Sequence, residues 1–234
     1  MGSDGKPRAM NKFDAVVFDM DGTILDTVND LADAMNHALE AVGCPKRPVS
    51  DARRFLGNGY ERLMRLVLPE GTEEAVVQKS LAAFREYYLV HCKDTTKPFP
   101  GIRELLAALK SRGVKTAVVS NKIDGACREL ASKHFPGLLD AAVGERPGVR
   151  KKPAPDTVET VLSELGVPEE RAVYVGDTEV DVETAQNAGI PSIIVTWGFR
   201  DRPYLETLGA DAMADTPEEL AEDLGIAECL GTGE

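Results

Sequence analysis

Two carboxylates stand two positions apart directly after a short apolar run. Asp19 and Asp21 follow the apolar segment 15–18, and Gly22 and Thr23 come next. Such a run predicts a buried strand that ends at the carboxyl edge of a sheet, where open α/β folds bind their ligands. Gly22 and Thr23 are expected to turn the chain and leave backbone amides facing an anion. A metal-assisted reaction is indicated, although a plain Asp-Gly hairpin turn is the alternative.

Further polar groups follow three later strand patterns. They are Ser120 with Asn121, Lys151 with Lys152 just before a helix, and Asp177 with Asp181. Because the carboxyl ends of parallel strands lie at the same edge of a sheet, these groups can converge on the first two acids. Singly, they are typical of a turn, a solvated loop and a helix N-cap. Their common placement at strand ends favours one active site.

The elements that position these groups alternate between helix and strand after residue 99, which predicts a parallel sheet. Helices are predicted at 102–112, 123–133, 156–165, 178–188 and 216–224, and strands at 116–119, 141–143, 172–175 and 193–195. Between 27 and 96 the apolar spacing is helical at 27–42, at the short stripe 63–67 and at 75–90, and no clear strand pattern interrupts these segments. We predict an α/β fold in which a Rossmann-like parallel sheet has helices on both faces and a small all-helical cap is inserted. The core would cover 11–26 and 97–228, the cap 27–96, and a disordered leader, native or added by cloning, 1–10.

Composition limits the function classes. The 234 residues carry 27 Lys and Arg against 39 Asp and Glu, a net charge of −12, which argues against a broad nucleic-acid or anionic-membrane surface. No apolar run reaches membrane-spanning length, and residues 1–8 lack a signal-peptide core. The cysteines, at 44, 92, 127 and 229, form neither a zinc motif nor a disulfide framework, which favours a cytoplasmic protein.

The polar groups together resemble a known set of motifs. Asp19-x-Asp21-Gly-Thr, Ser120-Asn121, Lys152-Pro153 and Gly176-Asp177-Thr178-x-x-Asp181 are similar, in order, to the four motifs of the haloacid dehalogenase-like phosphohydrolase superfamily. Finer features resemble its phosphoglycolate phosphatase branch: Ser120-Asn121-Lys122, Leu56-Gly57-Asn58-Gly59, Lys152-Pro-x-Pro-Asp156 and Thr196-Trp197-Gly198. Dehalogenases of this superfamily lack the second aspartate, so Asp21 favours phosphoryl transfer.

The resemblance implies a role for each acidic residue. Asp19 would attack phosphorus and form an aspartyl-phosphate. Asp21 would protonate the leaving oxygen and later deprotonate water, and its carbonyl would bind the metal. Mg²⁺ would be held by Asp19, Asp21 and Asp177, with Asp181 and Thr178 supporting that set from behind.

The resemblance also implies a phosphate cradle and cap contacts. Lys152 would supply charge to the phosphate, and it is preferred to Lys151 because Pro153 follows it. Ser120 would donate a hydroxyl, and Asn121, Gly22 and Thr23 would complete the cradle. Substrate contacts from the cap are expected at Arg54, Asn58 and Gly59, with Arg53 nearby. The remaining aromatic and imidazole groups are interpreted as ordinary helix or core residues: His37, His91, His134, Tyr87 and Tyr88.

The predicted function is a Mg²⁺-dependent phosphomonoester hydrolase that acts on a small phosphorylated metabolite, first of all 2-phosphoglycolate. Neither nucleic acid nor membrane is expected as a partner, and a monomer or homodimer is expected. The alternatives are a phosphomutase of the β-phosphoglucomutase type and a pyrophosphatase or nucleotidase of the same superfamily. A non-enzymatic alternative is a phospho-accepting signalling or binding module, which also gathers acids, a hydroxyl and a lysine at strand ends.

Overall fold

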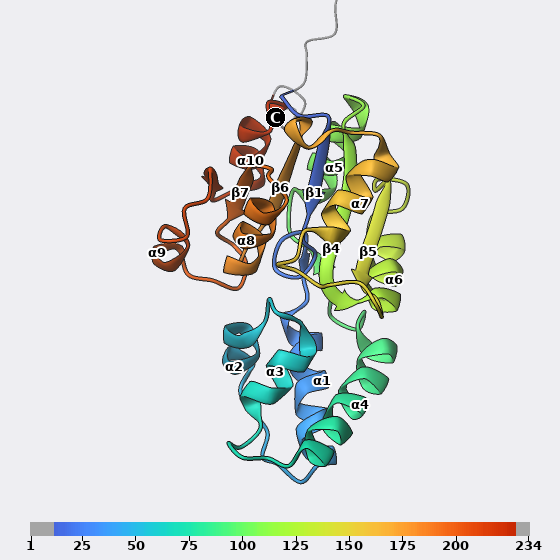
Figure 1. Cartoon of the computed structure of the whole chain (residues 1–234), viewed down its shortest axis with the longest axis vertical. Coiled ribbons are helices and arrows are strands. Elements are labelled where there is room, and N and C mark those ends of the chain that lie inside the picture. The colour runs from blue at the N-terminus through green and yellow to red at the C-terminus, as the bar shows by residue number, and fades with distance from the viewer. Residues whose placement is uncertain (1–11, 228–234) are drawn as a thin grey trace, which may run out of the picture.

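The fold has two parts, which Figure 1 shows one above the other. The structure is a computed structural model and describes residues 12–227. The upper part is a sheet covered by helices, and the lower part is a group of helices, α1 to α4, at the carboxyl edge of that sheet. The leader proposed at 1–10 and the proposed core end at 228 lie outside the described residues.

The sheet has six strands, all paired in parallel. Their order is β5 (Ala141–Glu145), β4 (Lys115–Ile123), β1 (Ala15–Phe18), β6 (Ala172–Gly176), β7 (Ser192–Val195) and β8 (Ala212–Ala214). In the register, Phe18 pairs with Val118 on one side and Val175 on the other. The parallel sheet is therefore confirmed. Strand β8 was not predicted, because three residues are too short for a periodic pattern.

Helices cover both faces because side chains alternate along the strands. Val16 and Phe18 belong to the apolar cluster that includes α5 (Ile102–Ser111), α6 (Asp124–His134) and α10 (Pro217–Asp223). Ala15 and Val17 pack on the other face, with α7 (Asp156–Leu165) and α8 (Glu179–Asn187). Two short elements complete this part: α9 (Arg202–Leu205) and the 3₁₀ turn at Glu169–Arg171. This is the Rossmann-like arrangement predicted.

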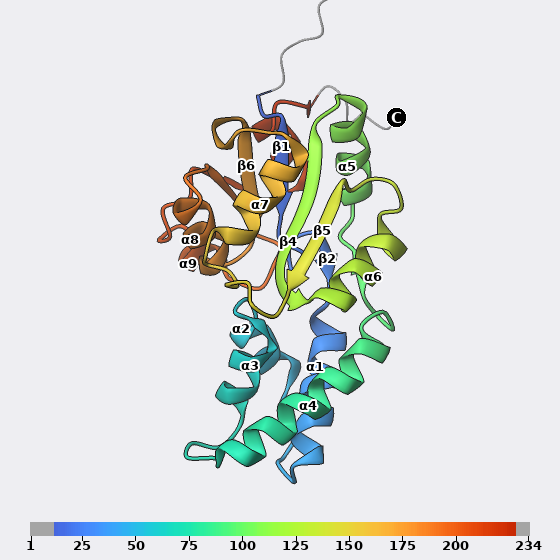
Figure 2. The same cartoon turned by 45° about the vertical axis from the view of Figure 1, so that its right-hand side comes forward.

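The lower part is the helical cap. It consists of α1 (Val28–Ala41), α2 (Val49–Phe55), α3 (Gly59–Val67) and α4 (Glu74–His91), and Figure 2 shows it as a unit set apart from the sheet. Apolar side chains of α1 and α4, such as Leu31, Met35 and Phe84, are buried in one cluster with the core. The all-helical cap is confirmed, but α2 was not predicted, since its seven residues bury only Ala52 and show no apolar stripe.

Two short strands connect the cap to the core. β2 (Leu25–Asp26) pairs in the antiparallel sense with β3 (Lys97–Pro98), so the chain enters and leaves the cap at neighbouring points. The proposed cap boundary, 27–96, falls between these strands. No helix among residues 12–227 is long and apolar enough to cross a membrane.

Candidate active site

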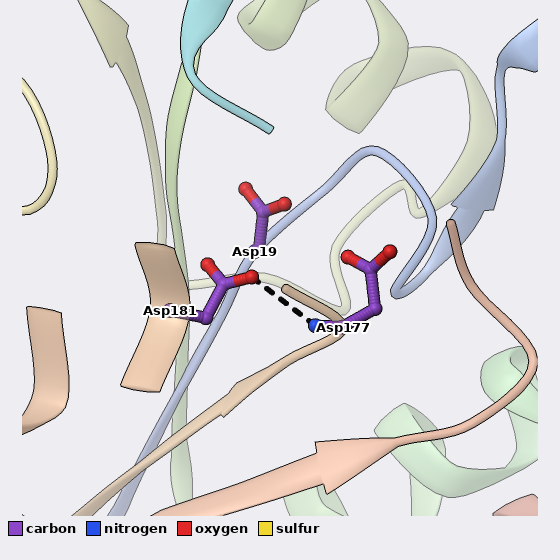
Figure 3. A group of neighbouring side chains, drawn as sticks. All are labelled: Asp19, Asp177 and Asp181. Atoms are coloured by element: carbon purple, nitrogen blue, oxygen red, sulfur yellow. Dashed lines mark hydrogen bonds between the residues drawn. The ribbon is translucent and has the colours of Figure 1, made fainter. Parts of the chain in front are cut away.

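Three buried aspartates meet where β1 and β6 end. Asp19 directly follows β1, Asp177 directly follows β6, and Asp181 lies in the first turn of α8. One carboxylate oxygen from each lies within 4.8 Å of the others, as Figure 3 illustrates. Their exposed fractions are 5% for Asp19 and 0% for the other two. The neighbouring parallel strands β1 and β6 thus bring Asp19 next to Asp177, which lies 158 positions later in the chain. The sequence predicted this convergence at the carboxyl edge of the sheet.

Backbone and hydroxyl donors orient these carboxylates. Asp181 accepts hydrogen bonds from the backbone nitrogen of Asp177 at 3.1 Å, and from the nitrogen and hydroxyl of Thr178 at 3.0 and 2.8 Å. These contacts include the capping box that begins α8. Asp177 accepts from the nitrogen of Phe199 at 2.7 Å and from the hydroxyl of Thr23 at 3.1 Å. These donors hold the carboxylates of Asp177 and Asp181 in place.

Two glycines allow the backbone to approach Asp177 closely. A Cβ atom at Gly22 would lie 2.4 Å from Oδ2 of Asp177, and one at Gly198 would lie 2.2 Å from the same atom. Gly22 also has a φ of 86°, which disfavours other residues. Larger side chains at these two positions would displace the aspartate.

The expectation that Gly22 and Thr23 offer free amides to an anion is wrong. The nitrogen of Gly22 donates to the carbonyl of Leu25 at 2.9 Å, and that of Thr23 donates to the carbonyl of Met20 at 3.4 Å. The chain folds back on itself tightly after Asp21, so both amides are used in hydrogen bonds within the turn. Both residues instead shape the surroundings of Asp177.

Lys152 is the lysine that reaches the acidic cluster. Its Nζ lies 2.8 Å from Oδ1 of Asp19, from Oδ1 of Asp181 and from the hydroxyl of Tyr174. The side chain is 3% exposed, whereas Lys151 is partly exposed. The hydroxyl of Tyr174 in turn donates a hydrogen bond to the carbonyl of Val119 at 2.9 Å. Tyr174 was not among the predicted site residues.

The electrostatics of the cluster follow from burial. Burial raises the pKa of Asp19 to about 6, and Lys152 opposes that shift only in part. The pKa of Asp177 is raised well above its usual range by burial and by the negative charges of Asp181 and Asp19. The same acids raise the pKa of Lys152, so its ammonium stays charged.

This donor set fits a divalent cation. Three carboxylates face a single lysine here, so the cluster retains an excess of negative charge. Hard oxygen ligands in a preorganised group are what Mg²⁺ prefers. The carboxylate of Asp21 is not part of this cluster and contacts Lys122 instead.

The stretch 120–122 belongs to a strand rather than to a turn. β4 continues to Ile123, and its register with β5 shifts between Val119 and Ile123. Ser120 accepts a hydrogen bond from the backbone nitrogen of Lys122 at 3.3 Å, and its own hydroxyl hydrogen can still be donated. Asn121 donates from Nδ2 to the carbonyl of Lys152 at 3.0 Å and so joins two of the predicted motifs.

The carboxylate of Asp21 forms an ion pair with Lys122. Nζ of Lys122 lies 2.6 Å from Oδ1 of Asp21 and also donates to the hydroxyl of Tyr88, a residue of cap helix α4. Tyr88 is 1% exposed, as expected for a core residue, but its hydroxyl serves this polar pair. Lys122 belongs to the Ser120-Asn121-Lys122 motif, but no role was predicted for its side chain.

A small cavity separates the core motifs from the cap. Its core wall contains Asp19, Asp21, Ser120, Asn121, Lys122 and Ile123, and its cap wall contains Leu31, Leu56, Gly57, Gly59, Tyr60, Phe84 and Tyr88. Gly59, one of the expected substrate contacts, is part of this cap wall. Among the described residues, neither Arg54 nor Asn58 lines this cavity. Arg54 lies instead beside the ring of Phe55, 5.5 Å from its centroid.

Hydrogen bonds between the two parts hold the cap against the core. Arg200 donates to the carbonyl of Leu56 at 2.8 Å while its guanidinium pairs with Glu179. Arg53, another cap residue named in the sequence analysis, donates to the carbonyl of Gly198. Nδ2 of Asn121 lies 3.4 Å from the carbonyl of Gly57. The loop before α3 is thus closed over the acidic cluster.

Comparison with known proteins assigns the chain to a family. A family model described as haloacid dehalogenase-like hydrolase matches residues 16–195, which include all four motifs. The chain belongs to this family of hydrolases. The hydrolase is 35% identical over 185 residues to a phosphoglycolate phosphatase of Aquifex aeolicus, a match that covers 79% of this chain and 85% of the relative. It is 33% identical over 230 residues to a phosphoglycolate phosphatase of Caulobacter vibrioides, covering 93% and 95%.

A solved structure agrees with this assignment. A protein of Lactobacillus delbrueckii subsp. bulgaricus superposes on the hydrolase with a TM-score of 0.86 and 40% identity, covering 92% of this chain and 99% of the other. The resemblance and the fold predicted from the motifs are thereby confirmed.

The histidines of this hydrolase all lie in helices, as interpreted from the sequence: His37 in α1, His91 in α4 and His134 in α6. His37 stacks on Tyr87 with ring centroids 4.4 Å apart, and Tyr87 stacks on His91 at 4.2 Å. His91 also pairs with Asp94 at 2.8 Å. His134 is buried in α6, where burial lowers its pKa.

Proposed function

We propose that this hydrolase is a Mg²⁺-dependent phosphatase that removes the phosphate of a small phosphomonoester, first of all 2-phosphoglycolate. The observation that carries the proposal is the placement of Asp19. Its carboxylate lines the closed cavity while Oδ1 lies 2.8 Å from the ammonium of Lys152. A nucleophile and a fixed positive charge are therefore adjacent where a phosphoryl group would lie.

Asp19 is proposed as the nucleophile. The bond from its carboxylate oxygen to phosphorus forms as the bond to the ester oxygen breaks, giving an aspartyl-phosphate that water then hydrolyses. Attack by one anion on another requires compensating charge, which Lys152 supplies at the attacking carboxylate. The hydroxyl of Ser120 is proposed as a donor to a phosphate oxygen.

Asp21 is proposed to move the proton. It lines the same cavity two residues after Asp19, so its carboxyl group can reach the leaving oxygen on the substrate side. It would protonate that oxygen in the first half-reaction and take a proton from water in the second. Phosphate ester cleavage needs such a group because an alkoxide is a poor leaving group.

The acidic cluster is proposed as the Mg²⁺ site. Asp19 and Asp177 would hold the ion together with the carbonyl of Asp21, and Asp181 and Thr178 would orient them. When bound, Mg²⁺ supplies positive charge that stabilises the transferring phosphoryl group. Proton competition for these acids should make the binding of the ion dependent on pH.

The relatives named above support the substrate. Both are called phosphoglycolate phosphatases and match most of this chain. The small cavity, walled by Leu31, Leu56 and Phe84, also favours a small ester over a large one. We further propose that the enzyme works in the cytoplasm, since Cys44, Cys92 and Cys127 are free.

Phosphate release over a panel of esters tests the proposal. The panel contains 2-phosphoglycolate, sugar phosphates, nucleotides and pyrophosphate, with and without Mg²⁺, and Asp19→Asn is the control because it preserves volume. Selective Mg²⁺-dependent release from 2-phosphoglycolate, lost in Asp19→Asn, is the expected result. Release centred on another ester would replace the substrate, sugar-phosphate isomerisation would indicate a phosphomutase, and stable phosphorylation without turnover would indicate a signalling module.

A further inference from the structure

Lys122 is a buried cation that the proposed chemistry at Asp19 does not use. Its side chain is 1% exposed, and its Nζ contacts Oδ1 of Asp21 at 2.6 Å and the hydroxyl of Tyr88. The ammonium also lies 4.6 Å from the centre of the Tyr88 ring. Burying an ammonium costs free energy unless it has partners, so a buried lysine at this position is expected to have a specific function.

The position of Lys122 in the wall of the cavity indicates what this function is. Among the described residues that line the cavity, Lys122 is the one Lys, Arg or His. The neighbouring cap wall is largely apolar, with Leu31, Leu56 and Phe84. The other buried lysine, Lys152, is already held by two carboxylates and a tyrosine hydroxyl. A substrate with a second anionic end therefore meets one cation beyond the phosphate position.

We infer that Lys122 binds the carboxylate of the substrate and that Tyr88 positions it for this contact. The inference rests on the proposed function. An ammonium has three N–H donors, and the contacts with Asp21 and Tyr88 use two of them. The third can serve an incoming carboxylate. Since Tyr88 belongs to the cap and Lys122 to the core, this pair makes recognition of the carboxylate depend on a closed cap.

A pair of matched substrates tests this role. 2-Phosphoglycolate and 2-hydroxyethyl phosphate have the same chain length, and a carboxylate in the first is replaced by an alcohol in the second. We expect Lys122→Met to lower kcat/KM for 2-phosphoglycolate at least about tenfold more than for 2-hydroxyethyl phosphate, as loss of a charge-assisted hydrogen bond implies. Tyr88→Phe should change the same ratio in the same direction by a smaller factor. The control is Lys79→Met, which removes an exposed lysine of α4.

The possible outcomes separate the inference from its rivals. An equal relative fall in kcat/KM for both substrates, which leaves their ratio unchanged, would show that Lys122 acts through Asp21 alone and would overturn the inference. If thermal melting shows that Lys122→Met does not fold, the ratio of kcat/KM for the two substrates is measured in Tyr88→Phe and in Lys122→Arg instead. Arg keeps the positive charge at this position. A wild-type enzyme that hydrolyses 2-hydroxyethyl phosphate but not 2-phosphoglycolate contradicts the proposed substrate instead. A wild-type preference for 2-phosphoglycolate that survives in Lys122→Met contradicts only the role of Lys122.

Discussion

The ammonium of Lys152 lies 2.8 Å from Oδ1 of Asp19, although 133 positions separate the two residues in the chain. The pair is buried on both sides, with side chains 3% and 7% exposed. Asp181 shares the same ammonium at 2.8 Å. One cation therefore compensates two carboxylates, and its removal has consequences for both folding and catalysis.

Replacing this lysine should destabilise the protein and inactivate it. Lys152→Met leaves Asp19 and Asp181 without their common partner, and breaking a buried pair in this way costs about 3–5 kcal/mol of unfolding free energy. Urea unfolding measures that loss, and phosphate release measures activity. The neighbouring Lys151→Met is the matched control and should change stability by no more than about 0.5 kcal/mol. Equal effects of the two substitutions would refute the assignment of Lys152.

The stability of the metal-free protein should depend on the protonation of the acidic cluster. Folding raises the pKa of Asp19 to about 6 and that of Asp177 well above its usual range. The folded state therefore binds more protons than the unfolded state, and the part of this contribution that comes from Asp19 is lost as pH rises from about 4 through about 6. Mg²⁺ relieves the repulsion that remains, so its stabilising effect should be larger at pH 7.5 than at pH 5.

Thermal melting with and without Mg²⁺ at both pH values checks this expectation. Asp177→Asn should show a smaller Mg²⁺-induced rise in Tm and a weaker dependence of activity on Mg²⁺. Glu164→Gln, an exposed acid of α7, is the control and should behave as the wild type. If Asp177→Asn retained the full Mg²⁺ effect, the proposed ligand set would be incorrect.

The close approach of Gly22 to Asp177 predicts an effect of a single methyl group. Gly22→Ala places Cβ 2.4 Å from Oδ2 of Asp177 and should push that carboxylate out of position, with a large loss of Mg²⁺ affinity. Gly43→Ala is a matched control, because Gly43 has a similar φ of 75° but no atom within 4 Å of its added Cβ. Both variants should lose about 1–3 kcal/mol from backbone strain, whereas only Gly22→Ala should require more Mg²⁺ for activity. Titration of activity with Mg²⁺ distinguishes them.

The contact of Arg200 with the cap should influence substrate binding more than chemistry. Arg200→Gln removes the hydrogen bonds to Glu179 and to the carbonyl of Leu56, so the closed cap becomes less stable. We expect KM to rise about tenfold and kcat to change less, since the groups around Asp19 are untouched. Arg202→Gln, which pairs with Glu206 on the surface, is the control. A fall in kcat with unchanged KM would contradict the assignment of Arg200 to cap closure.

Local patterns allowed much of the site to be predicted from the sequence. Asp19, Asp177 and Lys152 each follow a strand or precede a helix, and parallel topology alone places such positions on one edge. The geometry of the turn after Asp21 was not predictable in this way, because sequence does not reveal which carbonyl an amide of Gly22 will meet. The contacts of Tyr88 with Lys122 also escaped prediction, since they join helix α4 to strand β4 across the interface between cap and core.

The pairing of β2 with β3 makes the cap an exchangeable module. The chain leaves the core and returns to it through two adjacent strands, so the cap is inserted at a single place, as a long loop would be. A different helical insert joined at Asp26 and Lys97 would leave β1, β4 and β6, and the groups at their ends, in the same places. Evolution can therefore change which ester is accepted by replacing the lid, while the machinery that breaks the bond is inherited intact.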